Sequence, residues 1–220
     1  ILAQRHKDIK NGLSAPPTLT LNSIIQILKK PGWCIKMLNT SNKTFGNILG
    51  HVKGVDDLSS IVKWTEKQFD QGLSWDYVKW IRRVWKGPLI LKGILDKDDI
   101  KIAKKLDIQG IIVSNHGGRQ LDGSRSPFDQ IKLISDAVGD KVDIILDGGV
   151  RRGTHVLKAI AAGAKACSFG KAFLFSLSAG GQKGVEKLLQ NMHDEIQRNM
   201  ILMGCKNLKD LNYSRLIFRR

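Results

Sequence analysis

The chain has 220 residues, of which 42% are hydrophobic and 25% are charged, a balance typical of a globular protein with a sizeable core. No uninterrupted apolar run approaches the roughly 20 residues that a membrane-spanning helix needs, which excludes a bilayer-spanning protein. The three cysteines are too few and too widely spaced for a disulfide framework or a metal cluster: Cys34, Cys167 and Cys205. With no signal peptide visible, we expect a cytoplasmic protein, and the chain starts at Ile1 without an initiator methionine, as a fragment would.

The formal net charge is +16 at pH 7, and two basic stretches contain tryptophans, residues 29–33 (KKPGW) and 79–86 (KWIRRVWK). Such stretches are typical of proteins that bind an anionic membrane surface or a nucleic acid. Lysines recur on the polar faces of all the expected helices, however, which favours a solvated basic surface. No nucleic-acid motif is present, so we expect no nucleic-acid partner and keep peripheral attachment to the inner membrane as the alternative.

The first third of the chain predicts short helices separated by loops. Residues 1–17 are polar and end in two prolines, so they predict a loop with at most a short turn. Apolar residues at helical spacing predict helices over residues 21–30 and 58–69. The stretch between them is rich in glycine and asparagine and predicts a long connection.

From residue 74 onward, helices and strands alternate. The first helix is expected over residues 74–85, with apolar side chains spaced for burial at Tyr77, Val78, Ile81 and Val84. A strand over residues 88–92, a helix capped by Asp96 and a strand over residues 110–114 follow.

The second part of this alternation begins at Ser126, where the sequence Ser-Pro-Phe-Asp predicts a capping box and a helix that Gly139 ends. A strand is expected over residues 142–146, a helix over 153–162, a strand over 166–169 and a final helix over 184–203. A stripe on the final helix is expected to be core: Val185, Leu189, Met192 and Ile196. This alternation predicts a parallel sheet, but only four strands are found, whereas a (β/α)8 barrel closes with eight.

A glycine-rich loop, residues 114–123 (SNHGGRQLDG), follows the apolar strand, and catalytic groups of α/β barrels lie at such strand ends. The imidazole of His116 can accept a proton near neutral pH, and the guanidinium of Arg119 matches a carboxylate. The pair suggests a substrate with a carboxylate next to a removable proton. The alternative is a histidine satisfied by backbone contacts and a solvated arginine.

Two further strand ends predict a phosphate site. Residues 147–153 (DGGVRRG) follow a strand and open a helix, and glycines and helix-start amides favour phosphate. Gly170 and Lys171 end the next strand, where barrels often hold phosphate. Lys92 ends the strand expected over residues 88–92, at the same rim; by itself such a lysine is usually solvated.

Residues 114–123 resemble the signature of the FMN-dependent 2-hydroxy-acid dehydrogenases, the family of glycolate oxidase, flavocytochrome b2 and the bacterial membrane-associated L-lactate dehydrogenases. The last group is the most similar, because further segments resemble its pattern: residues 45–51 (FGNILGH), 53–54 (KG), 68–70 (QFD) and 89–95 (LILKGIL). The resemblance implies an α/β fold that is the C-terminal half of a (β/α)8 TIM barrel, with strands five to eight. Residues 1–220 are then a partial domain, in which 1–73 form the region after strand four and 74–220 form βα units five to eight.

The resemblance also implies the FMN-dependent oxidation of an L-2-hydroxy acid, and we expect L-lactate to pyruvate. His116 is the expected base and contacts the substrate, while Arg119 and Arg5, the latter within residues 4–11 (QRHKDIKN), hold its carboxylate. Whether the base removes the hydroxyl proton with hydride transfer or the α-proton to give a carbanion stays open. The electron acceptor, a quinone, a cytochrome or oxygen, also stays open.

The FMN contacts that the resemblance implies include Asp147 on the ribityl hydroxyls, Arg151 near the phosphate and Lys92 beside the flavin pyrimidine. The full set is Lys92, Ser114, Asp147, Gly148, Gly149, Val150, Arg151, Gly170 and Lys171. Lys171 stands where most members of the family have arginine. Lysine keeps the positive charge but cannot form the two parallel hydrogen bonds of a guanidinium. The replacement could therefore weaken flavin binding or have no effect on it, and both alternatives stay open. No metal is expected.

The family's aspartate that orients the histidine, a substrate-contacting tyrosine and several flavin contacts lie on the first four strands, which are missing here. A half-barrel exposes strand edges and predicts a homo-oligomer, a complementing N-terminal half, or instability. The alternative function is therefore a truncated, non-catalytic remnant that needs a partner chain. A third hypothesis, a relative of IMP dehydrogenase, requires a catalytic cysteine in a strand-end loop, whereas Cys167 falls inside a predicted strand.

Overall fold

The computed structural model describes residues 6–12, 19–41, 45–48, 50–55 and 57–218. The chain divides into two compact units, residues 1–73 and residues 74–220.

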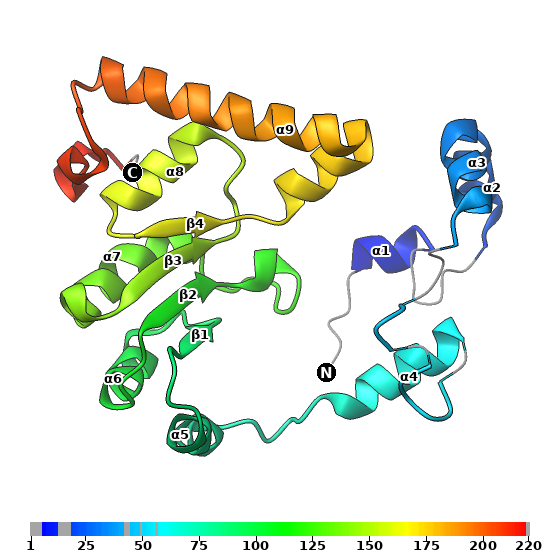
Figure 1. Ribbon diagram of the computed structural model, residues 1–220, viewed down its shortest axis with the longest axis horizontal. Coiled ribbons are helices and arrows are strands. Elements are labelled where there is room, and N and C mark those ends of the chain that lie inside the picture. The colour runs from blue at the N-terminus through cyan, green and yellow to red at the C-terminus, as the bar shows by residue number, and fades with distance from the viewer. Residues whose placement is uncertain (1–5, 13–18, 42–44, 49, 56, 219–220) are drawn as a thin grey trace. The chain divides into compact units, whose positions relative to one another are not determined.

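The N-terminal unit is helical, with α1 (His6–Lys10), α2 (Leu21–Leu28), α3 (Pro31–Asn39) and α4 (Leu58–Gln68) (Figure 1). Side-chain caps start two of them: Thr20 accepts from the amide of Ser23 at α2, and Asp57 accepts from the amide of Ser60 at α4. The two helices predicted in this region, α2 and α4, are confirmed.

The loops predicted in the N-terminal unit are partly wrong, because α1 and α3 lie in them. Helix α1 has only five residues, little more than one turn. Helix α3 begins with Pro31, whose fixed φ suits the first turn of a helix, and it packs against α2. The Pro-Gly pair therefore starts a helix rather than breaking one.

The C-terminal unit is built on a four-stranded parallel sheet with the order β1-β2-β3-β4. Its strands are β1 (Ile90–Lys92), β2 (Gly110–Ser114), β3 (Asp143–Asp147) and β4 (Ala166–Ser168). In the register of the sheet, Ser114 pairs with Asp147 and Asp147 pairs with Ser168, so the last residues of these strands lie at one edge. The prediction of an α/β protein with a parallel sheet is confirmed.

Five helices accompany the sheet: α5 (Trp75–Val84), α6 (Lys97–Lys105), α7 (Pro127–Val138), α8 (Gly153–Ala161) and α9 (Lys171–Leu202) (Figure 1). The core lies between the strands and helices α6, α7 and α8, and its most buried side chains are β-branched or aliphatic: Ile100, Ile111, Val113, Ile131 and Ile134. Central strand β2 is buried along most of its length, as expected for a strand covered on both faces.

The helix ends follow the predicted signals at Asp96, Ser126 and Gly139, but Ser126 does not form the predicted capping box. Asp96 accepts from the amide of Asp98 at the start of α6, and Gly139, with φ of 61°, ends α7. The capping box at Ser126 is wrong, because its side chain makes no cap hydrogen bond. Pro127, in the first turn of α7, starts this helix through its fixed φ.

Two predicted apolar faces are less buried than their spacing suggests. All residues of α5 are described and none is buried: Tyr77 is 46% exposed and Val84 is 66% exposed. On α9, Met192 is buried as predicted, but Leu189 is 52% exposed. Helical spacing identifies an apolar face, whereas burial also requires a neighbouring element that covers it.

Helix α9 starts 13 residues before the predicted position and is kinked at Gly181, where φ is 58° and ψ is −145°. After this kink the two arms of α9 approach each other closely at Gly184. A Cβ added at Gly184 would lie 2.2 Å from the carbonyl oxygen of Ser176, so only glycine fits there.

The chain continues through two single-turn 3-10 helices, residues 208–210 and 213–215. Leu211 and Leu216, which follow them, pack in a small cluster with Leu157 and Ala161 of α8. Within the described ranges, helices long and apolar enough to cross a membrane are absent.

Candidate active site

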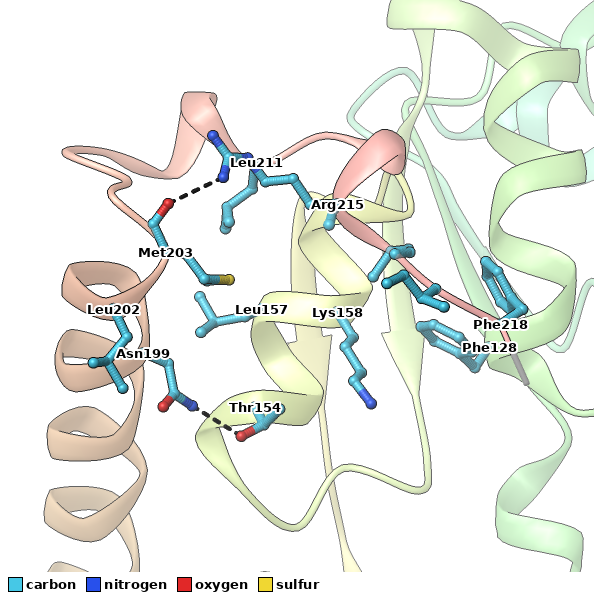
Figure 2. Close-up of a pocket in the computed structure, with 13 residues that line it drawn as sticks. Phe128, Thr154, Leu157, Lys158, Asn199, Leu202, Met203, Leu211, Arg215 and Phe218 are labelled. Carbon is cyan, nitrogen blue, oxygen red and sulfur yellow. Dashed lines mark hydrogen bonds between the residues drawn. The ribbon is translucent and has the colours of Figure 1, made fainter.

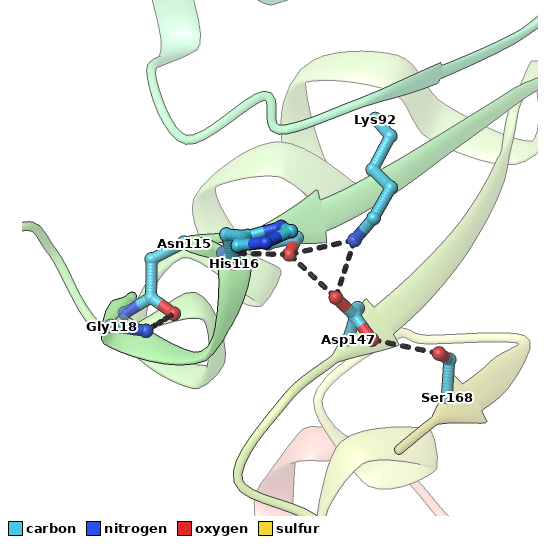
Figure 3. A network of polar contacts seen from close by, with 7 residues as sticks. Lys92, Asn115, His116, Gly118, Asp147 and Ser168 are labelled. Carbon is cyan, nitrogen blue, oxygen red and sulfur yellow. Dashed lines mark hydrogen bonds and ion pairs between the residues drawn. The ribbon is translucent and has the colours of Figure 1, made fainter. Parts of the chain in front are cut away.

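A network of polar side chains joins the carboxyl ends of the four strands (Figure 3). One oxygen of Asp147, Oδ2, accepts hydrogen bonds from Lys92 Nζ at 2.5 Å and from Ser114 Oγ at 2.6 Å. Its other oxygen, Oδ1, accepts from Ser168 Oγ at 2.7 Å. Lys92 Nζ also lies 3.0 Å from Ser114 Oγ. The parallel register brings these residues together, because each stands at the end of its strand.

The Asp147 carboxyl is ionised at neutral pH. Burial by itself raises the pKa of this carboxyl, but the hydrogen bonds from Lys92, Ser114 and Ser168 lower it further than burial raises it. The resulting pKa lies below the usual value for an aspartate. Lys92 is therefore part of an ion pair at the edge of the sheet rather than a simply solvated lysine.

The loop that carries His116 is attached to the same network. The backbone amide of His116 donates to Ser114 Oγ at 3.0 Å, and the amide of Gly118 donates to Asn115 Oδ1 at 3.1 Å. His116 has φ of 56°, a left-handed conformation that is uncommon outside glycine and often found at functional sites. His116 is exposed, and Figure 3 shows it in the turn that follows β2.

Of the two arginines expected to hold a substrate carboxylate, the structure describes Arg119 and not Arg5. Arg119 follows the His116 turn, donates its backbone amide to the carbonyl of His116 at 3.3 Å and is exposed. Arg5 lies outside the described residues. The structure thus places the backbone of Arg119 at the end of the His116 turn, and both halves of the carboxylate clamp stay predictions.

The glycine loop after β3 touches the His116 loop. Gly148 has φ of 99°, and a Cβ added there would lie 3.8 Å from the Cα of Gly117. From the next strand end, Lys171 Nζ donates to the carbonyl of Gly117 at 3.0 Å. Gly149 and Gly170 face open space where a Cβ would stand. These contacts gather the predicted phosphate-binding residues beside the predicted base.

Two residues of the predicted phosphate loop have other surroundings. The side chain of Val150 is 2% exposed and packs in the core, so only its backbone is left for ligand contact. The backbone amide of Arg151 donates to His155 Nδ1 at 3.2 Å, and Arg151 is an exposed residue.

The start of α8 is bound by a side chain from α9, which the sequence analysis missed. Glu195 accepts from the amide of Gly153 at 2.9 Å, from Thr154 Oγ1 at 2.6 Å and from Arg152 at 2.7 and 3.0 Å. The hydrogen bond from Thr154, followed by that from Arg152, lowers the pKa of the Glu195 carboxyl to about 2. The first amide of α8 is therefore engaged, contrary to the expectation that it binds phosphate.

Cys167 lies within β4, as predicted, and burial raises the pKa of its thiol to about 11. A thiol with such a pKa is almost entirely protonated at neutral pH and is a poor nucleophile. This environment argues against a cysteine-based mechanism of the IMP dehydrogenase type. Within the described ranges, clusters of histidine, cysteine or acidic residues that could hold a metal are absent.

A separate cavity of about 610 Å³ lies between α8, the end of α9 and the C-terminal segment (Figure 2). It is lined mainly by apolar side chains, among them Leu157, Leu202, Leu211 and Phe218. The residues predicted from the sequence to form the site do not line it. The cavity is therefore distinct from the strand-end network.

Comparison with known proteins identifies the family. The sequence profile of the FMN-dependent dehydrogenases matches residues 1–218. The chain is 36% identical over 210 residues to an L-lactate dehydrogenase of Caulobacter vibrioides, covering 94% of this chain and 54% of that protein. The chain thus spans about half the length of the curated relatives it matches.

Solved structures agree with this comparison. The fold is similar to a monotopic membrane protein, (S)-mandelate dehydrogenase, with a TM-score of 0.91, 27% identity and coverage of 100% of this chain and 58% of that chain. A flavocytochrome b2 variant with pyruvate bound has a TM-score of 0.63 and 34% identity, with coverage of 72% of this chain and 43% of that one. The chain therefore belongs to the family of FMN-dependent dehydrogenases.

Proposed function

We propose that this chain provides the FMN-binding and substrate-binding strand ends of an L-2-hydroxy-acid dehydrogenase that oxidises L-lactate to pyruvate. The observation that carries this proposal is the network of Lys92, Ser114 and Asp147 next to His116. The names of the relatives support lactate, and the mandelate enzymes among the similar structures support the wider class of 2-hydroxy acids.

The residues at the strand ends fit a phosphorylated flavin. Gly148 and Gly149 have positive φ, and open space stands over Gly149 and Gly170, so a ligand can approach the backbone there. Lys171 places a cation beside these glycines. Asp147 and Ser168 offer acceptor and hydroxyl groups suited to the hydroxyls of a ribityl chain.

In the proposed reaction, His116 takes a proton from the hydroxy acid and Arg119 binds its carboxylate, with Arg5 as the second contact. When bound, FMN supplies the two-electron acceptor that this oxidation requires. Lys92 holds a positive charge at the strand ends, balanced in the present structure by Asp147. A second acceptor of the quinone, cytochrome or oxygen class completes the proposed turnover.

We also propose that residues 74–220 form the C-terminal half of a (β/α)8 TIM barrel, strands five to eight, with residues 1–73 as the region that follows strand four. The consecutive order of the four parallel strands supports this, because successive strands of such a barrel are neighbours. The coverage of only about half of the relatives supports it as well. An N-terminal half or a second copy of this chain is then needed to cover the edge strands β1 and β4.

The same exposed surfaces support the alternative function, a non-catalytic remnant stabilised by a partner chain. Ile90 on edge strand β1 is 50% exposed. The apolar face of α5, the helix that precedes β1 in the chain, is also exposed. Such apolar surface is typical of a protein that binds another chain.

One experiment separates the two functions. The chain is purified, its flavin absorbance is recorded, and dye reduction with L-lactate is followed for the chain alone and for a completed barrel. The completed barrel is this chain mixed with the N-terminal half of the Caulobacter vibrioides L-lactate dehydrogenase. Flavin binding and lactate-dependent reduction support the enzyme, whereas a colourless and inactive completed barrel supports the remnant.

A peripheral membrane location is proposed for the N-terminal unit. Helices α2 and α3 expose large apolar side chains, including Leu21 at 83%, Leu28 at 71% and Trp33 at 54%, close in sequence to Lys29 and Lys30. Apolar and basic residues combined in this way are typical of helices that lie on anionic lipid. Co-sedimentation with phosphatidylglycerol vesicles, compared with neutral phosphatidylcholine vesicles, tests it; equal absence from both pellets contradicts it.

A further inference from the structure

The glycine loop after β3 ends in two adjacent arginines that have different surroundings. The guanidinium of Arg152 is bound by Glu195, with nitrogen to oxygen distances of 2.7 and 3.0 Å. Arg151 is instead held through its backbone, whose amide donates to His155 Nδ1 at 3.2 Å. His155 is half-buried and lies in the first turn of α8.

This hydrogen bond determines the form of the imidazole. A ring nitrogen that accepts a hydrogen bond carries no proton, so this contact requires the form of His155 that has its proton on Nε2. The arrangement is related to a capping box, in which a side chain of the first helical turn reaches back to a backbone amide before the helix. Here the acceptor is an imidazole, and the amide belongs to a residue of the predicted phosphate loop.

We propose that His155 is a positioning residue of this loop. By accepting the Arg151 amide it fixes the peptide group between Val150 and Arg151, while Glu195 retains Arg152 at the start of α8. The guanidinium of Arg152 is therefore bound to Glu195, whereas the side chain of Arg151 is available to bind a phosphate group. This inference rests on the proposed function in one respect, that the phosphate is the one on FMN.

The proposal predicts an effect confined to the phosphate of the ligand. Riboflavin has the same ring system and ribityl chain as FMN but lacks the phosphate. Loss of the His155 contact should therefore weaken FMN binding and leave riboflavin binding nearly unchanged. A residue needed only for folding would weaken both flavins together.

The test compares three variants of the 220-residue chain by flavin fluorescence titration. His155→Ala should weaken FMN binding roughly 3- to 10-fold, the effect of one hydrogen bond, and change riboflavin binding by less than about 2-fold. His155→Asn offers an amide oxygen as acceptor and should restore FMN binding to within about 2-fold of the parent chain. His193→Ala, at an exposed position on α9, is the matched control and should bind both flavins like the parent chain.

A second readout needs no flavin. Long-range ¹H–¹⁵N spectra of the flavin-free chain at neutral pH should show His155 with an unprotonated Nδ1, and His155→Ala should shift the Arg151 amide resonance. A proton on Nδ1, unchanged FMN binding by His155→Ala, or an equal loss for riboflavin overturns the proposal. If the parent chain binds neither flavin, the proposed function fails, and the tautomer still decides whether His155 holds the loop.

Discussion

Ser114 Oγ lies 2.6 Å from Asp147 Oδ2, so a hydroxyl at the end of β2 donates to a carboxylate at the end of β3. The same hydroxyl accepts from the backbone amide of His116 and contacts Lys92 Nζ. Its one proton and two lone pairs are therefore all used. This single group links the predicted base, the cation and the carboxylate of the candidate site.

Asp147→Asn should weaken FMN binding roughly 10- to 100-fold, the effect of losing charge-assisted hydrogen bonds. The amide leaves Lys92 without its ion-pair partner and disturbs the hydroxyls of Ser114 and Ser168. The measurement is a flavin titration. The control is Asp143→Asn, which removes a carboxylate paired with Lys165 at the opposite end of the same strand. An equal loss from both variants would show that the effect is not specific to the strand-end network.

His116→Asn should lower the turnover of L-lactate by the completed barrel about 100- to 10,000-fold, because general-base catalysis contributes that much. Flavin binding should stay within about 2-fold of the parent chain, since the backbone amide that donates to Ser114 is retained. Dye-reduction kinetics and a flavin titration on the same preparations check the two expectations. If this variant keeps full turnover, His116 is not the base.

The lowered pKa of the Glu195 carboxyl predicts that the folded chain loses stability in acid. The pKa of this carboxyl is about 2 in the folded chain and 4.5 in its usual environment, so the unfolded state binds the proton first as the pH falls. The contribution to stability is complete above pH 4.5 and decreases as the pH falls towards 2. Urea unfolding of the parent chain followed by circular dichroism should therefore show a lower free energy of unfolding at pH 3 than at pH 6.

Glu195→Gln removes this ionisable group and should lower the free energy of unfolding at pH 6 by about 1–3 kcal/mol. The difference between variant and parent chain should become smaller at pH 3. Glu186→Gln is the control, because Glu186 is an exposed residue on the same helix whose side chain accepts a hydrogen bond from Gln182. A constant difference at both pH values would contradict the assignment of the acid effect to Glu195.

Gly184→Ala should destabilise the kinked α9 by about 1–3 kcal/mol, since the new methyl group would stand 2.2 Å from the carbonyl oxygen of Ser176. Gly180→Ala, where open space surrounds the added methyl group, should be neutral or slightly stabilising because alanine favours a helix. Thermal unfolding of the two variants provides the comparison. Equal melting temperatures would mean that the two arms of α9 are not packed closely in solution.

The sequence by itself determined the C-terminal α/β unit and the edge where its candidate site lies. Buried β-branched strands such as β2, the cap at Asp96 and the helix end at Gly139 are local features, and each can be recognised from a few neighbouring residues. Parallel strands carry their last residues to one edge, so the proximity of Lys92, Ser114 and Asp147 could be predicted without coordinates.

Only the tertiary structure decided which side chains complete that edge and which apolar faces are covered. Glu195 lies 42 residues from Gly153, and a solitary glutamate on an amphipathic helix gives no signal of the amide it binds. The roles of His155 and Ser168 likewise depend on their hydrogen-bond partners, Arg151 and Asp147, which only the structure identifies. The face of α5 has the spacing of a buried helix yet is exposed in this chain. The physical reason is the same for each: periodicity and caps depend on neighbours along the chain, whereas burial and side-chain pairing depend on elements that only folding, or another chain, brings close.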